Sequence, residues 1–359
     1  MWHNFKFNLT KKAILLCLPL LLFTGCFDSQ NPEDLSYVLT MGMDLSDDDT
    51  GSFTFAPAKT QTKDPTLLQA EGNTVAGALV KVDSEHSKST DLGQLKMVVV
   101  GESLLKNGEQ FLVFLEELER NQEISEKVLL LATEGKASDI LAQLIQEDQG
   151  LFLWDFHQNQ SQQVAIAKAL DLDAFLAELT EQNGAVVIPK ITLKDETITL
   201  GGGMVLVNYD YLFSLDQEEE EGYLLLLGEA EGAVIEAEYQ GHTVALEVVK
   251  NRVDYDFDVV DEKVVCTVLL QIQGDLIGAY ESNAFDVRKR AELTTLLENS
   301  IKDEMQHTIN IANEHEALEA FGLGAKARRY LFGEIGLESG IDDVEIVVDV
   351  HIFDVGKIR

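Results

Sequence analysis

The sequence predicts an α+β fold: a multidomain mixed α/β body whose C-terminal domain is an antiparallel sheet packed on a long helix. Three observations predict it. Strand-like and helix-like segments alternate through the first 200 residues, and runs that alternate apolar and polar residues dominate after Met204. Within the segment 284–316 an apolar residue recurs at every fourth position from Leu293 to Ile309, which is typical of a helix that buries one side.

The first half reads as alternating strands and helices. Segments 37–45 and 52–58 are predicted strands joined by the turn-forming residues 46–51, so we expect a hairpin. The elements expected next, in chain order, are a helix over 75–82 with Asn73 or Thr74 as N-cap, a strand over 94–100, a helix over 103–118, a strand over 127–132, a helix over 137–145, a glutamine-rich break at 158–163 and a helix over 164–179.

The second half is richer in strands. One or two strands are expected over 186–200, and Gly201, Gly202 and Gly203 begin the next one. Segments 243–248, 253–258 and 264–272 each alternate in hydropathy, which predicts a meandering antiparallel sheet with one buried and one acidic face. The long helix and a last strand over 344–352 follow. We therefore divide the exported chain into 35–200, a region of one or two α/β subdomains, and 201–359, an α+β domain.

The N-terminus has the pattern of an export signal. Lys6, Lys11 and Lys12 precede an apolar run at 13–23, and no acidic residue occurs before Cys26. At ~1.5 Å per residue the run spans about 16 Å as a helix, roughly half the hydrocarbon thickness of a bilayer. Residues 1–25 are therefore predicted to be a secretory signal peptide rather than a permanent span.

The end of this segment resembles a bacterial lipobox. Thr24, Gly25 and Cys26 fit the pattern, and Phe23 stands where leucine is usual. Cys26 is then predicted to become the lipidated first residue, with 26–34 as a tether; the alternative is an ordinary buried thiol. Two or more acyl chains give stable anchoring where one is marginal. Because Cys17 lies in the signal, Cys266 would remain without an intramolecular partner, and we interpret it as a small core residue.

The charge balance excludes several kinds of partner. The 359 residues include 27 Lys and Arg against 63 Asp and Glu, a formal net charge of −36. Such a surface repels phosphate backbones and anionic head groups, so we expect no nucleic acid binding and no electrostatic adhesion to a membrane. We interpret the acidity as a solvated surface, with a basic partner or cation binding as the alternative.

Few residues suggest chemistry. Glu304 and His307 form one Glu-x-x-His pair, but a di-iron site needs two such pairs, so a solvated helix face is the interpretation. The glycine-rich segment 322–326 lacks the ending of a phosphate loop and is expected to be a helix end and turn. The run 218–221 is expected to be a solvated loop or first helical turn. The sequence thus predicts a protein that is not an enzyme and has no catalytic residue, metal or cofactor.

Blocks along the chain resemble the Ger(x)C family. Cys26-Phe27-Asp28 and the segment from Tyr37 to Gly42-Met43-Asp44 are similar to the family's opening. Further blocks follow in the same order, namely "GNTVAGALVKV", "LGQLKMVVVGESLLKNG", "FLEELERNQEIS", "LLLATEGKASDIL", "LGGGMVLVNYDYLFSLDQEEEEGYLLLLG", "AFGLGAK" and "DDVEIVVDVHIFDVG". No single block is very specific, but their order after a lipobox is.

The resemblance implies a function. Members of the family are lipoprotein C subunits of spore germinant receptors, so it implies a non-enzymatic accessory subunit needed for nutrient-triggered germination. It implies integral membrane A and B subunits as partners, anchoring through Cys26 on the outer face of the spore inner or cell membrane, and no direct small-molecule binding. The alternative is an acidic surface lipoprotein that binds a solute or a cation.

Overall fold

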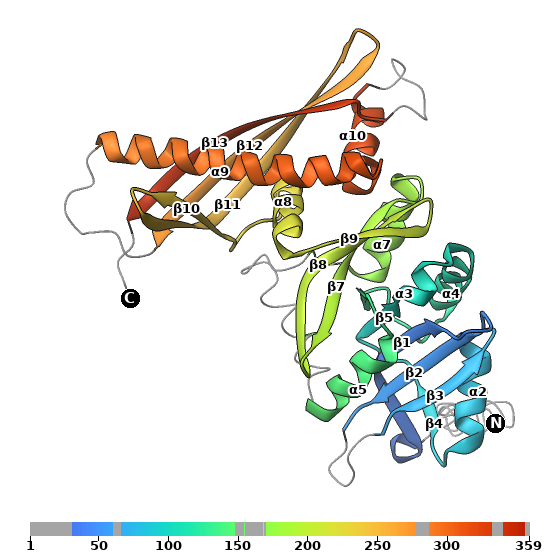
Figure 1. Cartoon of the computed structure of the whole chain (residues 1–359). Helices are drawn as coiled ribbons and strands as arrows, with labels where there is room; N and C mark the ends of the chain where they lie inside the picture. The colour runs from blue at the N-terminus through green and yellow to red at the C-terminus, as the bar shows by residue number, and fades with distance from the viewer. Residues whose placement is uncertain are drawn as a thin grey trace, which may run out of the picture.

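Figure 1 shows the computed structural model of the chain. The structure describes residues 31–59, 66–147, 154, 168, 170–277, 287–331 and 340–355. The predicted signal peptide, Cys26 and the first residues of the tether lie outside the described residues. Among the described helices, none is both long and apolar enough to cross a membrane.

A nine-stranded sheet organises the first part of the chain. Eight of its strands lie in the order β3 (Leu68–Gly72), β2 (Gly51–Pro57), β1 (Leu35–Leu45), β5 (Met97–Gly101), β6 (Leu129–Thr133), β7 (Val186–Lys194), β8 (Thr197–Val207) and β9 (Asp210–Leu215), and β4 (Ser89–Asp91) pairs with β1. The predicted hairpin is confirmed as β1 and β2. The central pairs from β1 through β5 and β6 to β7 are parallel, and antiparallel strands extend the sheet on both sides.

Helices cover both faces of this sheet. Helices α2 (Val75–Glu85), α3 (Glu102–Leu105), α4 (Gly108–Arg120) and α7 (Leu172–Glu181) bury one face, and α5 (Ala137–Glu147) buries the other. Val98 and Val100 therefore point into one core while Met97 and Val99 point into the other. Burial on both sides explains why β5, which contains these four residues, is continuously apolar instead of alternating.

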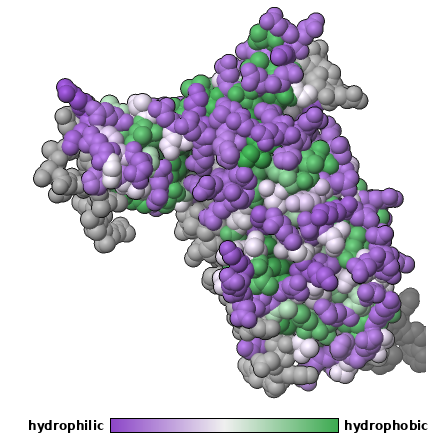
Figure 2. Space-filling model, in the orientation of Figure 1, coloured by the Kyte–Doolittle hydropathy of each residue, from purple (hydrophilic) through white to green (hydrophobic). Residues whose placement is uncertain are grey.

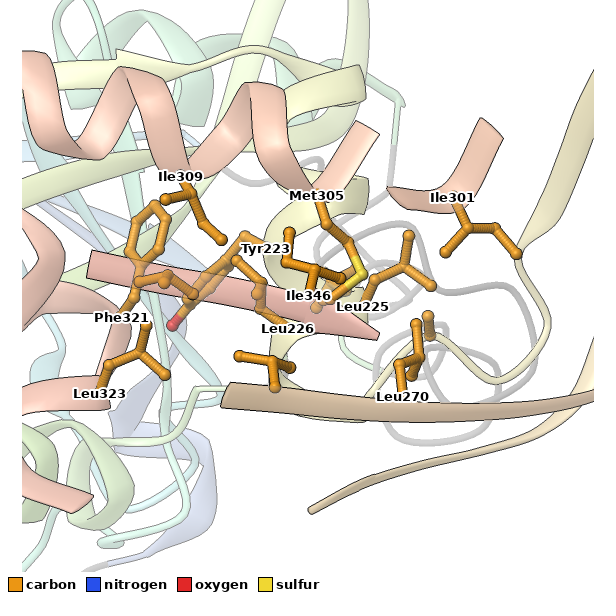
Figure 3. Packing of buried hydrophobic residues seen from close by; sticks show 14 of the residues in the cluster. Tyr223, Leu225, Leu226, Leu270, Ile301, Met305, Ile309, Phe321, Leu323 and Ile346 are labelled. Carbon is orange, nitrogen blue, oxygen red and sulfur yellow. The ribbon is translucent and has the colours of Figure 1, made fainter. Parts of the chain in front are cut away.

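The second part is a four-stranded sheet with a long helix. The strands lie in the order β10 (Val234–Tyr239), β11 (His242–Val260), β12 (Lys263–Ile277) and β13 (Asp343–Val355), with helices α8 (Gln217–Leu227), α9 (Val287–Glu314) and α10 (Leu323–Tyr330) and the 3-10 turn η2 (Leu318–Phe321). The predicted stripe of α9 is buried against the sheet: Leu293, Leu297, Ile301, Met305 and Ile309. Figure 3 shows Ile301, Met305 and Ile309 facing Ile346 and Leu270.

The α+β class is confirmed, but several details differ from the sequence predictions. Segments 243–248 and 253–258, expected as two strands, form the single strand β11. Strand β13 pairs parallel with β12, because the crossover through α9 brings the chain back in the same direction. The helix expected over 103–118 breaks into α3 and α4, where Asn107 caps the second. Of the helix expected over 164–179, residues 164–167 and 169 lie outside the described residues, and the described helix α7 starts at Leu172, where Asp171 supplies the N-cap. Gly322 turns the chain with φ 72° as expected, and a further helix, α10, follows it.

The two parts meet along β7, β8 and β9. The large sheet continues through β9 to Leu215, whereas the predicted division of the chain falls at residue 200, and that division stays a prediction. Hydrophilic residues cover most of the molecular face shown in Figure 2.

Candidate functional site

The junction between the two sheets is a continuous apolar core. Val187 and Val205 from the large sheet lie in the same buried cluster as Tyr223 of α8 and Phe321 of η2. The rings of Tyr223 and Phe321 are 4.8 Å apart. Figure 1 shows α8 and the chain around α10 lying between the two sheets. Because burial of apolar surface holds both parts together, a rearrangement of one sheet relative to the other would expose this core.

A buried ion pair lies within the junction. Lys168 is 7% exposed, and its Nζ lies 2.6 Å and 2.7 Å from the two Glu178 carboxylate oxygens and 3.3 Å from the Tyr223 hydroxyl. Burial by itself lowers the pKa of Lys168, but the nearby Tyr223 and Glu178 outweigh burial and hold the pKa above its ordinary value. The ammonium is therefore charged and paired, which suits a fixed contact rather than a proton-transfer group.

Glu220 adds a buried carboxyl to the same junction. The run 218–221 does form the first turn of α8, with a capping box between Asp216 and Glu219, but Glu220 is only 1% exposed. Its Oε1 accepts the backbone N–H of Lys168 at 3.4 Å, while its Oε2 has no hydrogen-bond partner among the described residues. Burial raises its pKa to about 8.

The prediction of a wholly solvated acidic run is therefore wrong at Glu220. The helical period turns this side chain toward the same side as Tyr223, three residues later, which is also buried.

Surface contacts join the two parts around the junction. Arg328 of α10 pairs with Glu319 and donates to the backbone carbonyl of Glu181 in α7 at 3.3 Å. Arg329 lies 2.5 Å from the Glu181 carboxylate. The imidazole of His315, at the end of α9, stacks on Phe213 of β9 with ring centroids 4.2 Å apart. These contacts connect α9 and α10 to the large sheet and its helix α7.

Asp44, which ends the first block of the family resemblance, has a structural role in the N-terminal part of the chain. The Asp44 carboxylate is 4% exposed and accepts the N–H groups of Ala137 and Ser138, at the start of α5. Gly101 lies against it, where an added Cβ would come within 1.9 Å of Asp44 Oδ1. Three blocks that the family resemblance rests on thus meet at one buried carboxylate.

The other residues singled out in the sequence are dispersed. Cys266 is fully buried in β12, as predicted, and burial raises the pKa of its thiol to about 12. Glu304 is not on a wholly solvated face: it packs against α8, its Oε1 is buried without a partner among the described residues, and burial raises its pKa to about 8. No group of three metal-binding side chains occurs within the described ranges.

Comparisons with known proteins cover both parts of the chain. Residues 28–193 match the spore germination protein N-terminal domain, and residues 201–356 match the C-terminal domain described as spore germination B3/GerAC like. Spore germination protein A3 of Bacillus subtilis (strain 168) is 22% identical over 283 residues, 76% of each chain. The putative spore germination protein YfkR of the same organism is 22% identical over 309 residues, 77% of this chain and 78% of its own.

One solved structure shares the fold. The crystal structure of the GerBC protein has a TM-score of 0.52 and 15% identity, over 88% of this chain and 97% of that one. Fold and junction thus define a two-part α+β protein in which both parts share one core. With both domain models matched in order, the chain belongs to the Ger(x)C family of spore germination proteins.

Proposed function

We propose that this chain is the lipid-anchored accessory (C) subunit of a nutrient germinant receptor, that it is not an enzyme, and that nutrient-triggered spore germination requires it. The observation that carries the proposal is the ordered match of both family domains over residues 28–193 and 201–356, directly after the lipobox cysteine. Its partners are the integral membrane A and B subunits of the receptor.

The arrangement of the described residues supports a binding role. The buried Lys168 is paired with Glu178, and Cys266 is a core thiol with a raised pKa, so neither is an activated nucleophile. Carboxylates in the large sheet serve as structural groups, such as Asp44 at the start of α5. The shared core makes the body a rigid adaptor that presents its surfaces from a fixed position.

The anchor is a lipid on Cys26, at the outer face of the spore inner membrane. A body with 63 acidic residues is repelled by anionic lipids, so attachment requires acyl chains, each buried CH₂ contributing ~0.8 kcal/mol. We expect the mature protein to begin at acylated Cys26, which the mass of its N-terminal peptide measures directly. An unmodified cysteine in that peptide would refute the anchor.

Spores that carry Cys26→Ala test the proposal. We expect the variant chain to leave the membrane fraction and nutrient germination to fall to the level of a deletion strain, while a receptor-independent trigger still works. Cys266→Ala is the matched control and should germinate like wild type. Displaced protein together with normal nutrient germination would contradict the requirement for an anchored subunit.

A further inference from the structure

The C-terminal sheet has one face without a covering helix among the described residues. Val344, Ile346, Val350 and Ile352 of β13 point into the core beside α9. The side chains that alternate with them point to the opposite face and are exposed. Figure 1 shows α9 lying along the sheet and the β11 and β12 hairpin extending beyond the helices.

Acidic side chains gather on this open face. The strand register places three rows side by side across β11, β12 and β13, and these rows are Asp258, Val265 and Asp343; Asp256, Thr267 and Glu345; and Asp254, Leu269 and Val347. We call these nine residues the acidic face. Both strands that flank β12 therefore present carboxylates on the same side of the sheet.

The carboxylates of the acidic face have little compensation. Arg252, one row away, lies 3.0 Å from Asp254, and the Tyr330 hydroxyl donates to Asp256 at 2.9 Å. In the described part of the chain, no Lys or Arg side chain lies within ion-pair distance of Asp258 or Glu345. The carboxylates repel one another along each strand and across β12, so folding does not require this pattern.

Two apolar side chains lie at one end of the acidic face, in the same row as Asp254. Leu269 is 39% exposed and its cross-strand neighbour Val347 is 51% exposed. Protein interfaces commonly combine a small apolar centre with a polar rim. Here carboxylates of β11 and β13 outnumber the one guanidinium, Arg252, in the next row, so the complementary surface is mainly cationic with an apolar or aromatic residue.

We propose that the acidic face docks a basic protein surface, in which Lys and Arg side chains lie beside an apolar or aromatic residue that contacts Leu269 and Val347. The inference rests on the proposed function, since the partner is then a subunit of the receptor. Anionic lipid and a second copy of this face carry the same sign of charge and are repelled. Opposite charge also accelerates encounter and favours the correct partner over others.

The test is recovery of the A and B subunits with the tagged full-length chain from detergent-solubilised spore membranes. The variant combines Asp254→Asn, Asp258→Asn and Glu345→Gln, which keep side-chain shape and relieve repulsion, so the chain remains folded. A matched control removes three exposed charges near α4 through Glu119→Gln, Glu123→Gln and Glu126→Gln. A third chain, Leu269→Thr with Val347→Thr, tests the two apolar side chains while keeping strand-forming residues.

We expect the acidic-face variant to recover at least about fivefold less of both subunits than wild type, and the control to stay within about twofold. Raising the salt to about 0.5 M should lower recovery with wild type and leave the variant unchanged, because screening removes the same attraction. The variant with Leu269→Thr and Val347→Thr should also recover less of both subunits than wild type.

Equal recovery with the acidic-face variant and wild type overturns the docking surface and leaves the receptor role intact. An equal loss of subunit recovery with the acidic-face variant and with the control also overturns it. The net charge of the chain, and not this face, would then determine recovery. Failure of wild type to recover either subunit, with normal nutrient germination of a deletion strain, overturns the proposed function and this inference with it. Retention of the chain on anionic vesicles through this face would instead identify a lipid contact and contradict the protein partner.

Discussion

Asp44 at the end of β1 accepts the backbone N–H of Ala137 at 2.8 Å, across 93 positions of sequence. The second carboxylate oxygen accepts the N–H of Ser138 at 3.1 Å. The first N–H groups of a helix lack partners within the helix, and a carboxylate satisfies them and opposes the positive end of the helix dipole. Asp44 therefore fixes α5 on the face of the sheet opposite α2, α4 and α7.

Asp44→Ala should lower the free energy of unfolding by about 1–2 kcal/mol, the usual cost of removing a helix cap. Thermal or urea unfolding of the purified exported part of the chain measures it. Asp47→Ala, at an exposed position of the adjacent turn, is the control and should leave stability within about 0.5 kcal/mol. An Asp44 variant as stable as this control would refute the capping role.

Glu220 predicts a stability that falls as the pH rises. Burial raises its pKa in the folded chain to about 8, from an ordinary value of 4.5, so the folded state holds a proton that the unfolded state releases. The contribution is complete below pH 4.5 and is lost as the pH rises toward 8, by at most about 5 kcal/mol. Glu304, whose pKa is also raised to about 8, adds a contribution of the same sign.

The Glu220→Gln variant isolates this contribution, because an amide resembles the protonated carboxyl. Its stability relative to wild type should increase between pH 5 and pH 8 in parallel denaturation curves. Glu231→Gln, at an exposed position in the same part of the chain, should show no such increase. If the difference in unfolding free energy between Glu220→Gln and wild type stays constant with pH, Glu220 is ionised in the folded chain.

Cys266 should be chemically silent in the folded protein. It is fully buried and its thiol pKa is raised to about 12, whereas the thiolate is the reactive form. A thiol reagent at pH 8 should label it only after denaturant unfolds the chain. Cys266→Ala should cost about 1 kcal/mol and leave germination unchanged. Rapid labelling of native protein would contradict the interpretation as a core residue.

Local patterns in the sequence predicted the elements that depend on local physics. The four-residue spacing from Leu293 to Ile309 predicted the buried stripe of α9, and the structure confirms it. Of the two candidate caps for the helix after residue 74, Thr74 accepts the N–H of Gly77. A strand was predicted over 94–100 from its apolar residues; the structure places it at Met97–Gly101, where both faces are buried.

Features that depend on distant contacts were not predictable. Glu220 lies in a run of four glutamates, and nothing in that run distinguishes the one that packs under Lys168 from its less buried neighbours. The parallel pairing of β13 depends on the route of the crossover, which periodicity does not record. Asp44 and Ala137 are separated by most of a domain, so only the fold reveals their hydrogen bond.

The most direct test of the central claim is the nutrient response of spores that lack this chain. Germination should be followed by loss of refractility for the deletion strain, the complemented strain and the parent, with nutrients and with a receptor-independent trigger. We expect the deletion to abolish or severely slow germination with at least one nutrient, complementation to restore it, and the receptor-independent response to stay normal. Parental germination rates in the deletion strain with every nutrient to which the parent responds would contradict the claim.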